Sequence, residues 1–206
     1  MTRITSGAGP VTFESAEDKA KFLELANYWR TDGQTGVDNL IRALRSADAF
    51  EIPNVITKAE AEVFFRRAQA YFEAHVGPRG HRQPVNYSGL ATDIEKHGPV
   101  YMRVAKIRAG AKDAEIQFSS KKDLQTFLEK VESWHTDQVD GIINLIEAAK
   151  AANVKGDGVL RRDEAKLLFD QISAVWLRKP RAPRGVHEME TYASLPETVR
   201  SLASVR

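Results

Sequence analysis

At 206 residues the chain is long enough for one domain, or for two domains of about 100 residues that each bury a core. A hydrophobic content of 42%, a charged content of 28% and a net charge of +2 are typical of a globular protein and do not indicate a nucleic-acid partner. The absence of cysteine excludes disulfides, thiolate zinc sites and cysteine nucleophiles. Neither a membrane-spanning run nor the apolar part of a signal peptide is found. A cytoplasmic location is our default prediction, and signal-independent secretion stays open.

The first predicted elements are a β-prone piece at 11–13 and a helix that begins near Ser15. Both recur about 105 positions later, at 115–118 and near Ser120. Between 13–41 and 118–146, roughly thirteen of about twenty-nine positions are identical, where chance would give about two. We therefore predict a tandem duplication, with repeat unit 1 at 1–103 and repeat unit 2 at 104–206.

Each unit is predicted to contain three helices, because apolar residues recur with a helical period after Ser or Thr residues that suit helix starts. Thr57 and Glu60, three residues apart, fit a capping box at one of these starts. In unit 1 the first helix begins at Ser15, the second runs from Thr35 to Ala47 and the third runs from Thr57 to about His75. In unit 2 the first helix begins at Ser120, the second runs from Val139 to Ala152 and the third begins near Arg161. Trp29 and Trp134 fall on the apolar faces of the first helices, so both are predicted to be core residues. A strand is predicted at 100–104, where the first unit leads into the second.

The loop between the second and third helices of unit 2, from Asn153 to Glu164, resembles an EF-hand calcium loop. The family needs oxygen ligands at loop positions one, three and five, glycine at six, an aliphatic residue at eight and glutamate at twelve. The residues there are Asn153, Lys155, Asp157, Gly158, Leu160 and Glu164. The resemblance implies a weak calcium site made by Asn153, Asp157, the carbonyl of Val159 and Glu164, because Lys155 cannot ligate a cation.

The matching loop of unit 1, residues 49–60, keeps the turn and the glutamate but not the ligands. Ala49 and Pro53 stand at positions one and five, whereas Asn54, Ile56 and Glu60 stand at six, eight and twelve. Two interpretations therefore remain open. In the one we prefer, the aliphatic residue forms a short β-bridge and the glutamate begins a helix. In the other, the second loop binds calcium.

Other candidate chemistry is sparse. No P-loop, Gly-x-Ser-x-Gly or His-Glu-x-x-His pattern occurs. Four basic residues that follow the last predicted helix are either a solvated loop or a partner-binding surface: Arg178, Lys179, Arg181 and Arg184. No aromatic residue is interleaved with them, so a nucleic-acid platform is not supported.

Together these patterns predict a mainly α protein of two similar three-helix units with EF-hand-like turns and short flanking β-strands. The function we favour is that of a non-catalytic interaction or structural protein, with a protein partner or self-assembly. The alternative is a weak calcium-binding EF-hand-type regulatory protein, and an enzyme of unknown type is the third hypothesis. The expected cofactor is either none or calcium.

Overall fold

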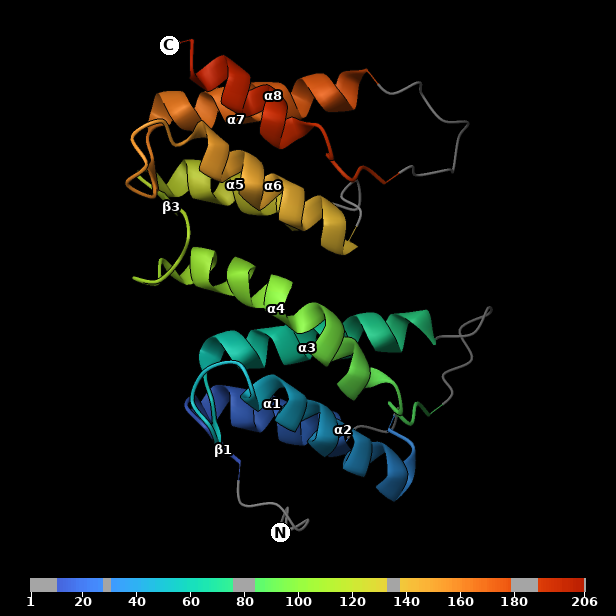
Figure 1. The fold of residues 1–206 in the computed structure, drawn as a ribbon. Coiled ribbons are helices and arrows are strands. Elements are labelled where there is room, and N and C mark those ends of the chain that lie inside the picture. The colour runs from blue at the N-terminus through green and yellow to red at the C-terminus, as the bar shows by residue number, and fades with distance from the viewer. Residues whose placement is uncertain (1–10, 28–30, 76–83, 133–137, 179–188, 206) are drawn as a thin grey trace. The chain divides into compact units, whose positions relative to one another are not determined.

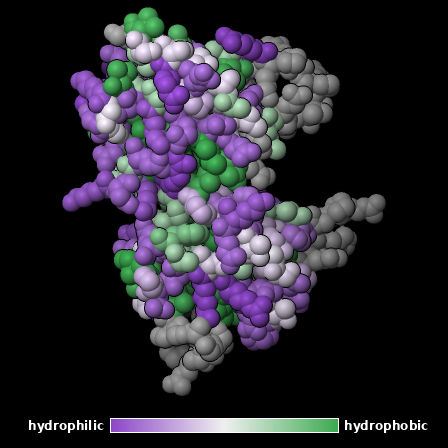
Figure 2. Space-filling view, viewed as in Figure 1, coloured by the Kyte–Doolittle hydropathy of each residue, from purple (hydrophilic) through white to green (hydrophobic). Residues whose placement is uncertain are grey.

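The computed structural model describes residues 11–27, 31–75, 84–132, 138–178 and 189–205, which form eight helices and four short strands (Figure 1). The chain divides into two compact units, residues 1–105 and 106–206, and each is described by itself. Hydrophilic residues predominate on the faces of both units that Figure 2 shows, with small groups of hydrophobic residues among them. Within the described ranges, no helix has the length and apolar character that crossing a membrane requires.

Unit 1 places a pair of very short strands beside its helices. In chain order its elements are β1 (Thr12–Phe13), α1 (Ala16–Asn27), α2 (Gly33–Asp48), β2 (Val55–Ile56), α3 (Lys58–Ala74) and α4 (Leu90–Ala109), the last of which runs past the unit boundary. The strands β1 and β2 are parallel, with Thr12 opposite Val55 and Phe13 opposite Ile56. This pairing attaches the loop before α3 to the segment that precedes α1.

Unit 2 contains a parallel strand pair of the same kind. Its elements are β3 (Gln117–Phe118), α5 (Lys121–Glu132), α6 (Gln138–Ala152), β4 (Val159–Leu160), α7 (Arg162–Leu177) and α8 (Leu195–Ala203). Gln117 lies opposite Val159 and Phe118 lies opposite Leu160. The aliphatic residue at loop position eight therefore pairs with the strand before the first helix in each unit.

The six helices predicted from periodicity are present, with ends that differ from the predictions by a few residues. The predicted count of three helices per unit is too low, because α4 and α8 were not recognised. The strand predicted at 100–104 is wrong, since these residues lie inside α4. Val100, Tyr101 and Val104 are buried there, so tertiary packing overrides their preference for strands. Trp29 and Trp134 lie outside the described residues.

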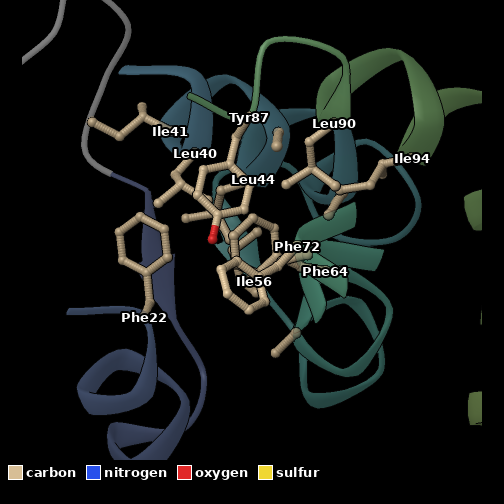
Figure 3. Packing of buried hydrophobic residues seen from close by; sticks show 14 of the residues in the cluster. Phe22, Leu40, Ile41, Leu44, Ile56, Phe64, Phe72, Tyr87, Leu90 and Ile94 are labelled. Carbon is tan, nitrogen blue, oxygen red and sulfur yellow. The ribbon is translucent and has the colours of Figure 1, made fainter. Parts of the chain in front are cut away.

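Tyr87 lies at the centre of the unit 1 core, in a segment to which the sequence analysis assigned no role. Figure 3 shows its ring among Leu40, Leu44, Ile56 and Phe72, which come from α2, β2 and α3. Tyr87 is 1% exposed and has a φ of 55°, a left-handed conformation that is costly for a residue with a bulky side chain. The core contacts of its ring compensate for this backbone strain.

The segment that leads into α4 is attached to α2 by a side-chain hydrogen bond. The Asn39 amide donates to the carbonyl of Asn86 at 2.7 Å. In unit 2 the Asn144 amide donates to the carbonyl of Thr191, also at 2.7 Å, and Tyr192 follows with a φ of 54° and 4% exposure. Both units therefore use an asparagine on the second helix to hold a buried left-handed tyrosine.

Candidate functional site

The loop between α6 and α7, residues 153–164, brings together the four residues predicted to bind calcium. Gly156 and Gly158 adopt φ values of 66° and 75°, which glycine tolerates without steric cost, and they turn the chain back toward β4. Asn153 is 9% exposed, so its side chain lies inside this turn.

Protein donors already engage all three of the predicted ligand side chains. The Asn153 Oδ1 atom accepts the backbone N–H of Gly158 at 2.9 Å. The two carboxylate oxygens of Glu164 accept the backbone N–H groups of Val154 and Arg161, at 2.9 and 2.8 Å. The Asn153 amide also donates to Asp157 Oδ1 at 3.2 Å and to the Val159 carbonyl at 3.0 Å. The loop is thus closed by its own hydrogen bonds.

The guanidinium of Arg161 faces three of the predicted ligands. Its Nη2 donates to Asp157 Oδ2 at 2.7 Å, and its Nη1 donates to Asp157 Oδ1 at 3.3 Å and to the Val159 carbonyl at 3.2 Å. The same Nη1 lies 3.9 Å from Glu164 Oε2. Three of the four residues expected to coordinate calcium therefore interact with one fixed positive charge.

This arrangement perturbs both members of the ion pair. The Arg161 side-chain hydrogen bond, supported by the Val159 N–H and the Asn153 amide, holds the pKa of Asp157 well below its usual range. The Asp157 carboxylate in turn raises the pKa of Arg161. A cation that approached Asp157 would have to displace the guanidinium from the carboxylate. Arg161 was not predicted to belong to this site, although its place four residues after Asp157 was the available signal.

The matching loop of unit 1 keeps the glutamate contacts without the ion pair. The Glu60 oxygens accept the backbone N–H groups of Glu51 and Thr57 at 2.9 and 2.8 Å, and the Thr57 hydroxyl accepts the Glu60 N–H at 3.3 Å. This is the predicted capping box, and the structure confirms it. Asn54 makes the turn with a φ of 67°. Glu60 is fully buried, and this burial is the main cause of its raised pKa.

A second candidate site is a groove of about 640 Å³ between α1 and α3 in unit 1. Its apolar lining is Leu25, Phe65, Ala68, Phe72 and Tyr87, and its polar lining is Lys21, Glu24, Glu62, Arg66 and Gln69. The Lys21 ammonium lies 4.3 Å from the centroid of the Phe65 ring. This groove was not predicted, because it depends on how two helices pack and not on the residue pattern of either helix.

The predicted basic surface is described only at its first residue. Arg178 is exposed and ends α7, where its backbone N–H donates to the carbonyl of Ala174 at 3.3 Å. Lys179, Arg181 and Arg184 lie outside the described residues.

In the part of the chain that the structure describes, no three His, Asp or Glu side chains form a group that could hold a metal ion. No family model, curated protein or solved structure matches the chain. The two loops and the groove are therefore interpreted from their own geometry.

Proposed function

We propose that the chain is a non-catalytic interaction or structural protein built from two duplicated helical units with EF-hand-like turns. The duplication is supported by matched details in the two units. These are the parallel strand pairs, the glutamates that cap α3 and α7, the asparagine bonds from the second helices, and the buried tyrosines at 87 and 192.

The observation that carries this proposal is the internal closure of the two loops. Glu60 and Glu164 each accept two backbone N–H groups, so the position-twelve glutamate acts as a helix cap in both units. In the second loop, Arg161 supplies the positive charge that a calcium ion supplies in an EF-hand. The helices that flank each loop are then held in one arrangement without a regulatory ion, as suits a protein that offers fixed surfaces to a partner.

The alternative of a weak calcium-binding regulatory protein is favoured by one specific observation. Asn153, Asp157, Val159 and Glu164 do lie together around one turn. Calcium binding there requires that Arg161 leave Asp157 and that Glu164 give up two backbone hydrogen bonds, and Lys155 adds further repulsion. Any site would therefore fall in the millimolar range of the weakest loops of this type.

Calorimetric titration with calcium, together with thermal unfolding in calcium and in EDTA, tests the proposal. We expect no heat of binding and no shift of the unfolding midpoint for the parent chain at submillimolar calcium. Lys155→Asp combined with Arg161→Leu should create or strengthen a site, because the first change supplies a carboxylate and the second removes the competing cation. Lys122→Asp, which repeats the Lys155→Asp charge change at an exposed position of α5, is the control for that substitution.

Tight calcium binding by the parent, with a large midpoint shift, would overturn the proposal in favour of the calcium sensor. A double variant that binds no calcium would show that the loop has only the shape of an EF-hand, which agrees with the proposal.

A further inference from the structure

The third helices of the two units carry the same ion pair with its polarity reversed. On α3, Glu62 precedes Arg66 by one turn, and the two side chains lie 3.8 Å apart. On α7, Lys166 precedes Asp170 by one turn, with 2.6 Å between them. The positions correspond, because each pair begins two residues after the capping glutamate, Glu60 or Glu164.

The two pairs stand in different surroundings. Glu62 and Arg66 line the groove between α1 and α3, and their side chains are 31% and 26% exposed. Lys166 and Asp170 stand on an open helix face, with side chains 70% and 53% exposed. Exposed pairs one helical turn apart contribute little to stability, so the α7 pair can exchange its internal contact for an intermolecular one at low cost. The groove pair is half-buried, and the Arg66 guanidinium also lies 5.5 Å from the centroid of the Tyr101 ring.

The apolar parts of the two surfaces also complement each other. Residues 166, 170, 173 and 177 form one stripe along α7, because residues three and four apart lie on the same side of a helix. This stripe ends in Leu177, which is 80% exposed. The groove of unit 1 offers the rings of Phe65 and Phe72 as an apolar lining.

We propose that the groove of unit 1 binds the α7 stripe of a second copy of this chain. Glu62 then faces the partner copy's lysine at 166, Arg66 faces its aspartate at 170, and the leucine at 177 meets the aromatic lining. This inference rests on the proposed function, for which it names the partner. The two contacting surfaces differ, so the association is heterologous and each copy keeps one groove and one stripe for further neighbours.

Charge reversal tests the proposal while keeping every charge paired within its own helix. The groove variant is Glu62→Lys with Arg66→Glu, and the stripe variant is Lys166→Glu with Asp170→Lys. In sedimentation velocity, the parent should show a mass that rises with concentration. Each double variant alone should associate at least about tenfold more weakly, because like charges then face each other.

Restoration is the decisive readout. The fourfold variant, and an equimolar mixture of the two double variants, should recover association, because each again pairs opposite charges across the contact. Lys122→Glu, an exposed charge reversal outside both surfaces, should behave as the parent does. A parent that stays monomeric at all concentrations would overturn the proposal. Double variants that associate as strongly as the parent would also overturn it. A mixture of the two double variants that does not recover association would do the same.

Repeating the runs in EDTA and in calcium separates this inference from the proposed function. Association in both conditions supports both. Association in calcium alone overturns the calcium-independent function and leaves the contact surfaces standing. No association in either condition overturns the surfaces and leaves the function standing.

Discussion

The two loops at 49–60 and 153–164 share a backbone turn and a glutamate cap, but they differ in the side chains at their centres. Each ends in a glutamate that accepts two backbone N–H groups, and each turns through a left-handed residue, Asn54 or Gly158. In the second loop, the Asp157 carboxylate accepts hydrogen bonds from the Asn153 amide and the Arg161 guanidinium. In the first loop, Ala49 and Pro53 stand in place of that asparagine and aspartate. The shape of the loop therefore depends on the glutamate cap and the left-handed turn residue, whereas the residues at loop positions one and five can differ.

The largest expected effect comes from removing the caps. Glu60→Ala should lower the free energy of unfolding by about 3–5 kcal/mol, because its fully buried carboxylate is the acceptor for the buried Thr57 N–H and the partly buried Glu51 N–H. Glu164→Ala should cost less, about 1–3 kcal/mol, because its side chain is 12% exposed and water can reach the freed groups. Urea denaturation measures both, with Glu73→Ala on the exposed face of α3 as the control. Equal costs would mean that burial does not distinguish the loops.

Substitutions of the turn residues should have an intermediate effect on stability, and this effect should differ between the two loops. Gly158→Ala should cost about 1–2 kcal/mol, because a Cβ atom is strained at a φ of 75°. The added atom would lie 3.6 Å from the Glu115 carbonyl oxygen, an ordinary contact, so the cost is one of backbone conformation. Asn54→Gly should change stability by only a few tenths of a kcal/mol, since glycine accepts the same conformation freely. Urea midpoints for both variants check this, and a neutral Gly158→Ala would contradict it.

The smallest effect concerns the pH dependence of the second loop. Arg161→Met should raise the pKa of Asp157 toward its ordinary value, because the principal cause of the depression is removed. A depressed pKa means that the contribution of Asp157 to stability is present above its ordinary pKa and is lost as the pH falls through the folded value. Carboxyl NMR titration measures the shift, and Arg162→Met, an exposed neighbour, is the control. An unchanged titration would show that Arg161 does not hold the carboxylate in solution.

Sequence patterns predicted those elements that depend on contacts between residues close together in the sequence. The capping box of Thr57 and Glu60 was predicted because its partners are three residues apart, and the structure confirms it. The helix through 100–104 was not predicted, because its β-branched and aromatic residues suggested a strand. The contacts of Arg161 were not predicted, because its spacing of four residues from Asp157 spans a loop, where spacing alone does not fix which side chains face each other.

The parallel pairing of Thr12 with Val55, and of Gln117 with Val159, has a consequence for the order of folding. Two helices intervene between the partners in each unit, so the strands meet only after both helices have brought the chain back. A contact between residues so distant in sequence requires the entropic cost of closing the intervening loop before any hydrogen bond between the strands can form. We therefore expect the strand pairs to be absent from the rate-limiting transition state. Truncation of Phe13 or Phe118, which are half-buried strand residues, should then accelerate unfolding and leave the refolding rate almost unchanged.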